Sequence, residues 1–472
     1  MKQLYIIYLS MLLFLSGCMV GPDYKKPQFT PSCKFEDASY PLMTQNAPFV
    51  KWWHTFHDPI LNQLITLAIQ SNLDLKLATS RIKAAREQYI IARAPLFPSI
   101  NVSGYYQRNR YSQDLPLIFT PKNPYQNLFL AEFDATWELD LFGGTKRAME
   151  SAVDSLQASV ENRRSVLVTL LAEVSNNYLL LRGTQQQIIV VKQNIASQED
   201  TYKLTKAQFD AGLTSDLTVM QIAALVEDTK ALIPPLEQTE VQAMHRISVL
   251  LGREPGALKT LLCHVKDLPC MPPQIPIGLP STLLCRRPDI REQERLLAAA
   301  TANIGVAVAN LYPQFALTGT YGQESSILSH FLRHTANIWS FAPNFTWPIF
   351  NGESLIANVH VQEELEIQAF VTYFQTILNA LEDVENSLNA YTEELKRHNI
   401  LAKEVEYDKQ AFKYATALYI AGVSDFLNVL DAQKTLFTSE FALTQSRTNL
   451  YTDLIAIYKA LGGGWECICL PN

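Results

Sequence analysis

Two stretches of the chain alternate between apolar and polar residues, which is the pattern of a β-strand with two different faces. The first covers residues 129–142 and reads FLAEFDATWELDLF. The second covers residues 339–349. Weaker alternation over 99–111 and 315–324 predicts a partner strand for each. The apolar face of the first strand holds Phe129, Ala131, Phe133, Ala135, Trp137, Leu139 and Leu141, and its polar face includes Glu132, Asp134, Thr136, Glu138 and Asp140.

Long helical patterns occupy most of the remaining sequence. A first helix is predicted from about Ile60 to Ala94, where Pro95 stops it. A very long helix follows over residues 146–211 and ends at Gly212, a natural C-terminal capping residue. Ser215 or Asp216 then caps a return helix that ends near Gly252.

The lengths of these helices restrict how they pack. The long helix, with about 65 residues, would extend roughly 100 Å. The return helix covers little more than half of that length, and the first helix would cover the rest. Stacked end to end, the two shorter helices match the long one, which favours a coiled-coil-like rod over a globule.

The whole arrangement occurs twice. Asp74, Pro98 and Gly104 align at one constant offset with Asp289, Pro313 and Gly319. LDLFGG at 139–144 aligns with WPIFNG at 347–352, and Gly212 aligns with Gly422. The second copy has a long helix at 353–421 and a return helix at 425–461. The predicted fold is therefore mainly α with a small β part, built from a duplicated unit. Its boundaries are repeat 1 at 60–255, a linker at 256–280, repeat 2 at 281–465 and a tail at 466–472.

The N-terminus resembles a bacterial lipoprotein signal. Lys2 precedes about a dozen apolar residues, too few to span a membrane. The run ends in LSGC, which places Cys18 where a lipobox cysteine is acylated. We predict a signal peptide at 1–17 and a lipidated tether at 18–59. The alternative is an ordinary signal with a chance cysteine. Met19 is not the aspartate that retains many lipoproteins in the inner membrane, so the outer membrane is favoured.

The four strands have the length and composition of membrane strands. Each has about ten residues, with aromatic residues near both ends, as at the interfaces of a membrane barrel. One face of a soluble sandwich is the alternative. Four strands cannot close a barrel, and an open edge cannot lie in lipid. Two chains would give eight strands and a filled interior, whereas three would give twelve strands and a pore. The strand acids Glu132, Asp134, Glu138 and Asp140 would then line water.

Charge and cysteine content exclude several classes of protein. The net charge of −7 and the lack of a basic patch argue against nucleic-acid binding. No CxxC motif or Cys/His cluster supports a zinc site. Export makes disulfides feasible, and Cys263 with Cys270 is the most plausible local pair. Free structural thiols are an equally good interpretation.

Catalytic or metal chemistry finds little support. HTFHD, with His54, His57 and Asp58, is compatible with a metal cluster, but a packed and capped helix start explains it better. GGTK at 143–146 lacks the spacing of a phosphate loop, and no G-x-S-x-G motif occurs. No nucleophile lies beside a base. The sequence therefore predicts no enzyme, no metal and no cofactor other than the lipid on Cys18.

Five motifs in fixed order resemble one known family. They are CMVGPDYKKP, WWHTFHDPILNQLI, WELDLFG, RRPDIREQE and AGVSDFLNVLDAQ. With the duplication, they are similar to TolC/OprM-type outer-membrane efflux proteins, in particular the lipoprotein (NodT-like) branch of the RND tripartite efflux systems. The resemblance covers essentially the whole mature chain. It implies a homotrimer with a shared twelve-stranded barrel and a periplasmic helical tunnel. It also implies docking to a periplasmic adaptor protein and an inner-membrane pump.

The resemblance assigns residues to the gate. Asp431, in the LDAQ motif, aligns with a constriction acid, and Asn428 takes a place where relatives often have a second aspartate. Tyr419 aligns with a tyrosine that helps hold the closed state. Ser424 lies where some relatives carry a tethering arginine. On an unknown helix, Asp431 would instead be a solvated surface acid.

The two glycine breaks are identified through the same resemblance as hairpin tips. Gly212, Leu213, Gly422 and Val423 are then expected to contact the adaptor. As capping glycines, the two breaks are structural in any case. The favoured function is a passive exit duct. The alternative is a structural outer-membrane lipoprotein without transport, which would not need amphipathic strands. An enzyme is disfavoured.

Overall fold

The computed structural model describes residues 19–29, 43–44, 50–112, 114, 124–269, 271–272, 275–278 and 280–466. The chain divides into two compact units, and each unit draws on both repeats. Unit 1 comprises Met1–Pro27, Arg81–Val160 and Glu292–Phe374. Unit 2 comprises Gln28–Ser80, Glu161–Arg291 and Gln375–Asn472. The predicted signal peptide and Cys18 lie outside the described residues.

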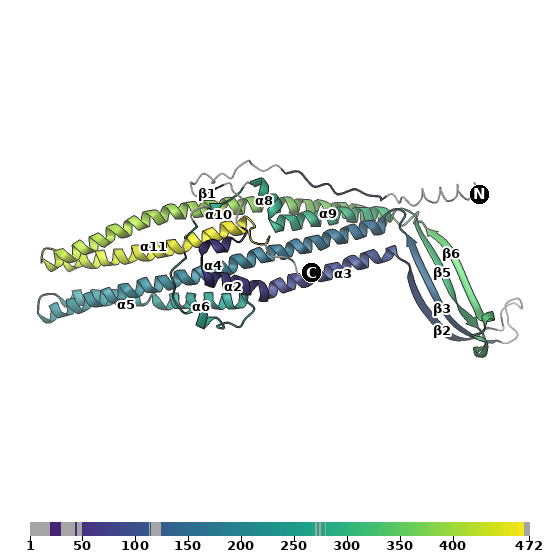
Figure 1. Cartoon of the computed structure of the whole chain (residues 1–472), viewed down its shortest axis with the longest axis horizontal. Coiled ribbons are helices and arrows are strands. Elements are labelled where there is room, and N and C mark those ends of the chain that lie inside the picture. Colours follow the sequence, from purple (N-terminus) through teal and green to yellow (C-terminus); the bar gives the residue numbers. More distant parts are fainter. Residues whose placement is uncertain are drawn as a thin grey trace. The chain divides into compact units, whose positions relative to one another are not determined.

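Unit 1 contains one four-stranded sheet with the strand order β2-β3-β5-β6 (Figure 1). Its strands are β2 (Ser99–Arg110), β3 (Tyr125–Leu139), β5 (Gln314–Ser325) and β6 (Asn337–Thr346). All three neighbouring pairs are antiparallel. The central pair joins β3 of the first repeat to β5 of the second, so the sheet depends on both copies of the unit. Strands β2 and β6 form its edges.

Two strand ends differ from the prediction. Strand β3 ends at Leu139, not at Phe142. Asp140 instead turns to the next helix, where its Oδ1 and Oδ2 accept hydrogen bonds from the backbone N–H groups of Thr145 (3.1 Å) and Lys146 (2.9 Å). These are free donors of the first helical turn, so capping them outweighs extending the strand. Strand β6 likewise ends three residues before Ile349.

The long helices are α4 (Gly144–Asp210) and α10 (Ser354–Ile420), and each has 67 residues. The second return helix, α11 (Phe426–Ala460), is continuous. The first return helix is divided into α5 (Asp216–Lys230) and α6 (Ile233–Leu250), so the prediction of one helix there is wrong. The cause is Pro234 and Pro235, which lack the N–H groups that would continue the helical hydrogen bonds.

The predicted first helix is also two helices, α2 (Pro59–Ser71) and α3 (Leu73–Arg93). Asn72 stands between them. Its Oδ1 accepts a hydrogen bond from Leu75 N (2.9 Å), and its Nδ2 donates to Leu250 O (2.9 Å). One side chain therefore caps α3 and satisfies a carbonyl at the end of α6. In the second repeat, α8 (Pro280–Arg286) and α9 (Pro288–Ala309) take these places.

Short elements fill the predicted linker and the N-terminal part of unit 2. The linker contains α7 (Lys259–Leu262) and β4 (Ile275–Pro276). Strand β4 pairs in parallel with β1 (Met43–Thr44). A 3-10 helix at Trp52–Phe56 precedes α2.

The HTFHD segment is packed and capped, as the sequence favoured. Trp52 stacks on Tyr458 with ring centroids 5.0 Å apart. Asp58 caps α2 through its Oδ1, which accepts from Ile60 N (2.8 Å). Its Oδ2 accepts from the Tyr178 hydroxyl (2.6 Å). The aspartate of the motif therefore serves helix capping and core packing.

No helix within the described residues is both long enough and apolar enough to cross a membrane.

Candidate functional site

The strand register places unlike residues on the two faces of the sheet. Val102, Phe133, Tyr321 and Trp339 form one row across all four strands. Their exposed fractions are 72%, 55%, 60% and 77%. The next row on the opposite face is entirely polar and consists of Asn101, Asp134, Thr320 and Ser340. One face therefore carries large exposed apolar side chains, and the other carries groups suited to water.

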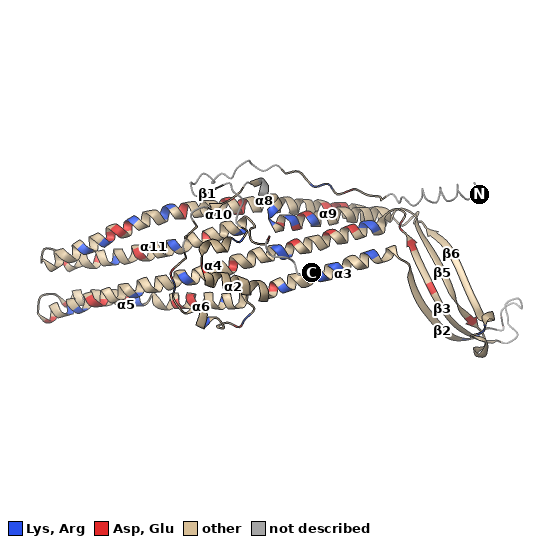
Figure 2. Cartoon of the chain, viewed as in Figure 1, with Lys and Arg blue, Asp and Glu red and all other residues tan. Residues whose placement is uncertain are grey.

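The acids of β3 lie on the polar face. Glu132 and Asp134 pair in register with Ser103 and Asn101 of β2. Asp134 Oδ2 also accepts a hydrogen bond from Ser103 Oγ (2.8 Å). Glu138 continues the same face. Figure 2 shows a few acidic residues in red on a sheet that is otherwise largely uncharged. Asp140 does not belong with them, because it lies beyond the strand and caps α4.

Each repeat fixes a tryptophan at the end of its sheet in the same way. The Trp137 indole N–H donates to Leu96 O (3.1 Å), and the Trp347 indole N–H donates to Leu311 O (3.1 Å). Both rings are more than a third exposed. Amphipathic aromatic side chains held in this way are typical of a membrane–water interface.

The two glycine breaks have the same backbone geometry. Gly212 has φ of +73° and Gly422 has φ of +71°, a region that favours glycine. In each break, the glycine N–H donates to the carbonyl of the residue three positions earlier. The N–H of the following residue donates to the carbonyl five positions earlier, which joins Leu213 N to Gln208 O and Val423 N to Leu418 O. This is a Schellman cap, which confirms the predicted ends of both long helices.

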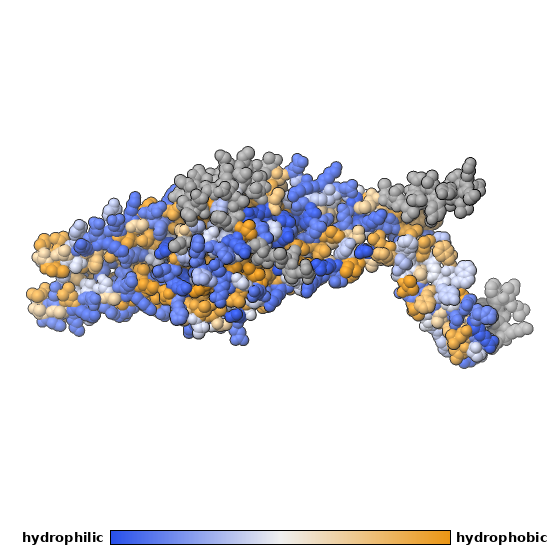
Figure 3. Space-filling view, in the orientation of Figure 1, coloured by the Kyte–Doolittle hydropathy of each residue, from blue (hydrophilic) through white to orange (hydrophobic). Residues whose placement is uncertain are grey.

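The tips beyond these caps are apolar and exposed. Leu213 is 78% exposed and Val423 is 75% exposed. Figure 3 shows apolar residues at the free ends of both hairpins. Other exposed members are Leu217, Met220, Ile420 and Leu427. Such surfaces mark interaction sites more often than isolated apolar residues do.

Asn428 and Asp431 share one exposed face of α11, because residues three apart in a helix are neighbours. Asn428 Nδ2 donates to Ser424 Oγ (2.9 Å). The carboxylate of Asp431 has no partner among the described residues. The structure therefore brings two of the three predicted gate residues together and leaves the acid available to a ligand in solution.

Tyr419 is in a different environment. Its ring packs edge-on against Phe426, with centroids 5.3 Å apart. Its hydroxyl donates to Gln208 Oε1 of α4. Phe426 belongs to a small buried cluster with Ile222 and Val429. Tyr419 thus links the second hairpin to the first and does not line the face of Asp431.

A polar seam that the sequence patterns did not predict lies between α4 and α11 in unit 2. Gln187 Nε2 donates to Gln445 Oε1. Further along, Asn194 Nδ2 donates to Glu440 Oε2 (3.3 Å), and Gln433 Nε2 donates to Ser197 Oγ (3.1 Å). The seam consists of Gln187, Asn194, Ser197, Gln433, Glu440 and Gln445. The sequence contained one sign of this seam: Gln187 and Asn194 are seven residues apart in the long helix, as are residues on one face of a coiled coil.

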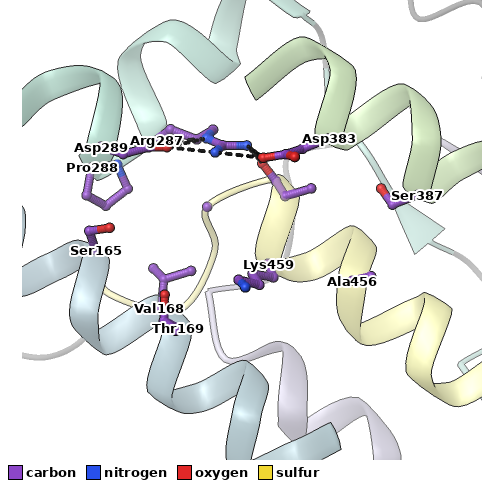
Figure 4. Close-up of a pocket in the computed structure, with 12 residues that line it drawn as sticks. Ser165, Val168, Thr169, Arg287, Pro288, Asp289, Asp383, Ser387, Ala456 and Lys459 are labelled. Carbon is purple, nitrogen blue, oxygen red and sulfur yellow. Dashed lines mark hydrogen bonds and ion pairs between the residues drawn. The ribbon is translucent and has the colours of Figure 1, made fainter. Parts of the chain in front are cut away.

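Arg287 of the RRPDIREQE motif borders a cavity of about 370 Å³ in unit 2 (Figure 4). Its guanidinium makes ion pairs with Asp289 (2.6 Å) and Asp383 (3.1 Å). It also donates to Ala460 O (3.0 Å) near the end of α11. Because two acids neutralise Arg287, the cavity does not carry strong positive charge. The arrangement is a joint between α9, α10 and α11.

One acid between α10 and α11 has a shifted titration. Burial, and then the charge of Glu394, raises the pKa of Asp453 to about 6. Nearby, burial followed by the charge of Arg447 lowers the pKa of His398. Asp453 therefore keeps its proton to a higher pH in the folded protein than a free aspartate does.

Replacing Asp453 with asparagine should stabilise the protein at pH 7.5 but not at pH 4. An acid whose folded pKa is raised contributes stability below its unfolded pKa and loses it as the pH rises towards the folded pKa. Asparagine keeps the neutral state at every pH. A shift of about two pKa units, discounted for partial solvent access, corresponds to about 1 kcal/mol. Thermal unfolding at both pH values measures this, and an equal effect at the two would contradict it.

Two of the cysteines, Cys263 and Cys285, lie within the described residues. Cys263 and Cys285 are exposed, and Cys263 Sγ donates weakly to Thr260 O (3.6 Å). Cys270 lies outside the described residues, so its pairing with Cys263 stays a prediction. The lipidation site, Cys18, also lies outside them.

A family model described as "Outer membrane efflux protein" matches the chain twice, at residues 64–253 and 279–463. Nodulation protein T of Rhizobium leguminosarum bv. trifolii is 31% identical over 458 residues, covering 96% of both chains. The probable efflux pump outer membrane protein TtgC of Pseudomonas putida is 32% identical, covering 96% of this chain and 93% of that protein.

Solved structures agree with these relatives. The outer-membrane channel OprN superposes with a TM-score of 0.91 at 33% identity, covering 95% of this chain and 100% of OprN. CusC superposes with a TM-score of 0.84 at 28% identity, covering 95% of this chain and 100% of CusC. The CusC structures were described in terms of folding and transmembrane channel formation. With the duplicated helical hairpins and the two-faced sheet, these matches identify the chain as a member of the outer membrane efflux protein family.

Proposed function

We propose that this protein is the outer-membrane exit duct of a tripartite efflux or type I export system, passively conducting substrates outward. The observation that carries the proposal is the sheet with one apolar and one polar face. A soluble structural protein would need to cover the exposed row of Val102, Phe133, Tyr321 and Trp339. Lipid accepts such a face, and the polar face then borders an aqueous channel.

The sheet supports a homotrimer. Strand direction alternates across β2, β3, β5 and β6, so the two edge strands run in opposite directions. Strand β6 of one copy can therefore pair antiparallel with β2 of the next. Three copies close a barrel of twelve strands without an open edge in lipid. In this assembly Glu132, Asp134 and Glu138 face the lumen.

The exposed helix faces within unit 1 support the same assembly. Ile90 and Ile91 of α3 are 52% and 70% exposed, and Ile356, Leu365 and Phe370 of α10 are 52%, 44% and 41% exposed. Helix α3 precedes the edge strand β2 in the chain, and helix α10 follows the edge strand β6. We assign these faces to contacts between neighbouring copies, where burial of apolar surface stabilises the trimer.

The helical hairpins form the periplasmic tunnel of the proposed duct. Gly212, Leu213, Gly422 and Val423 at their tips are the proposed contacts for a periplasmic adaptor protein, which links the duct to an inner-membrane pump. Asp431, Asn428 and Tyr419 are the proposed gate. The names of TtgC and its relatives associate those proteins with efflux pumps, and this chain aligns with TtgC over 96% of its own length and 93% of the length of TtgC.

We further propose lipid attachment at Cys18 as the only covalent cofactor. The domain boundaries follow: a signal peptide at 1–17, a tether at 18–59, repeats at 60–255 and 281–465 around the linker at 256–280, and a tail at 466–472. The two family matches and the repeated element order support these limits.

Planar-bilayer recording tests both the duct and its gate. The purified protein should give discrete, cation-preferring currents. Three Asp431 carboxylates around an axis would bind cations, so Asp431→Ala should raise conductance and weaken block by divalent cations about tenfold, as expected for losing roughly 1.4 kcal/mol of binding. Asp228→Ala, an exposed acid on α5, is the matched control and should leave currents unchanged.

The outcomes separate the duct from the alternative. Absence of discrete currents from a correctly folded trimer would favour a structural lipoprotein. Currents that Asp431→Ala does not change, in conductance or in block, would exclude a constriction at Asp431 while leaving the duct in place.

A further inference from the structure

The first described residues of the chain form a strap on unit 1. We define the strap as residues 20–26. Val20 N donates to Phe142 O (3.1 Å), the carbonyl of a residue between β3 and α4. From there the strap continues to side chains of α9. All of these residues belong to unit 1.

Arg147 of α4 holds the first half of the strap. Its side chain is only 2% exposed. The guanidinium donates to Val20 O (3.1 Å) and Gly21 O (3.3 Å), and it forms an ion pair with Asp23 (2.7 Å). A fourth bond goes to Glu150 (2.8 Å) of the same helix. A buried arginine with this number of partners has one orientation, so the strap backbone is held in register with α4.

Glu294 of α9 holds the second half. It is 8% exposed and accepts hydrogen bonds from the Tyr24 hydroxyl (3.3 Å) and Lys26 Nζ (3.0 Å). Arg295 pairs with Glu294 (2.7 Å) and lies over the Tyr24 ring at 5.7 Å. Burial, and then the charge of Glu294, raises the pKa of Tyr24 above its ordinary value, so the hydroxyl remains a donor.

The fit also depends on two glycines. A Cβ on Gly21, whose φ is +85°, would lie 2.4 Å from the Cα of Gly305 in α9. A Cβ on Gly305 would lie 2.8 Å from Cγ and Cδ of Arg147. Both contacts are far too short for any side chain. The surface of α9 is therefore shaped to receive the strap backbone beside the arginine.

We propose that Arg147, Glu294 and Gly305 form a dock that positions the lipid-bearing N-terminus at the junction of strand β3 and helix α4. This inference rests on the proposed lipidation of Cys18. Cys18 stands two positions before Val20, the first residue of the strap, so two peptide units, or about 7 Å of extended chain, separate the acylated residue from the strap. The lipid then leaves the protein at the base of the sheet, where the membrane surface meets the proposed barrel.

The dock also joins the two repeats. Phe142 and Arg147 belong to repeat 1, whereas Glu294 and Gly305 belong to repeat 2. The strap therefore ties α4 to α9 beside the paired strands β3 and β5. Arg147 is a positioning residue in this scheme, because it acts on the anchor through the strap.

Hydrogen–deuterium exchange of the full-length protein in detergent tests the dock. In the wild type, the amides of Val20, Gly21, Asp23 and Tyr24 should exchange slowly; Pro22, which lies among them, has no N–H. Arg147→Met should speed their exchange at least about tenfold, the factor for about 1.4 kcal/mol of lost closure. Asp23→Ala combined with Tyr24→Phe should have the same effect while leaving the core of unit 1 intact. Lys26→Ala should act in the same direction, whereas Lys25→Ala, its neighbour without an ion pair among the described residues, should not.

Three results would overturn the proposal. One is fast exchange of residues 20–24 in the wild type. Another is unchanged exchange in the double variant with Asp23→Ala and Tyr24→Phe. This result decides the question even if Arg147→Met fails to fold. The third uses a Cys18→Ala protein exported behind a different cleavable signal. If its strap exchanges fast, the membrane holds the strap and the dock does not. None of these measurements uses conduction, so a protein that fails as a duct can still pass them. Mass measurement of the N-terminal peptide reports lipidation separately.

Discussion

Replacing Arg287 with methionine is expected to cost about 3 kcal/mol of folding stability, the low end for removing one partner from a buried ion pair. The side chain of Arg287 is 11% exposed, and its loss would leave the carboxylates of Asp289 and Asp383 without their shared cation. The carbonyls of Ala380 and Ala460 would also lose a donor. Water reaches both acids, which keeps the cost below that of a fully enclosed pair.

Thermal unfolding followed by circular dichroism in detergent measures the effect of Arg287→Met. The matched control is Arg246→Met, because Arg246 pairs with Glu173 at a largely exposed site and such pairs contribute little. A melting temperature of Arg287→Met as high as that of the control would show that the joint in Figure 4 adds nothing to stability.

Replacing Gly183 with leucine is expected to cost about 3 kcal/mol, because it overfills a close contact between α4 and α11. A Cβ on Gly183 would lie 2.1 Å from Oγ1 and 2.8 Å from Cβ of Thr448. Thr448 is 3% exposed, so it has little room to move. The two helices must separate, and the polar seam beside them would open.

A double-mutant cycle with smaller changes isolates this contact. Gly183→Ala should destabilise the protein, and Thr448→Ala in the same chain should restore part of the loss, because it removes the nearest two side-chain atoms. The coupling should be about 1 kcal/mol. Lys192→Leu, on an exposed position of α4, controls for added apolar surface. Strict additivity of the two alanine changes would contradict the steric account.

The sequence predicted the elements that depend on local chemistry. Alternation between apolar and polar residues located the strands, since side chains of a strand point to alternate faces. Gly212 and Gly422 ended both long helices where expected, because the left-handed cap requires glycine. The duplication followed from constant offsets between identical residues. The strand and capping signals are each contained within a few neighbouring positions, and the duplication was found by comparing such short stretches with one another.

Some errors came from nearby residues that the strand and helix patterns had not taken into account, namely Pro234 and Pro235 and the helix start after Asp140; others came from a distant partner. Asp140 continued the strand pattern, but its carboxylate instead accepts hydrogen bonds from the free N–H groups at the start of α4. Asn72 gave no sign of a break until the end of α6 was placed beside it. The hydrogen-bond partner of Tyr419 was not predicted either, because Gln208 is 211 residues away in the chain.

By itself the sequence determined most of the secondary structure, the twofold repetition and the two-faced strands, because propensity, periodicity and capping are local. Only the tertiary structure decided that β3 pairs with β5 across the repeats, that α4 meets α11 through a polar seam, and that Arg147 holds the strap. These contacts join segments more than 100 residues apart. Their energies depend on burial and on distances between atoms, which no local pattern of residues specifies.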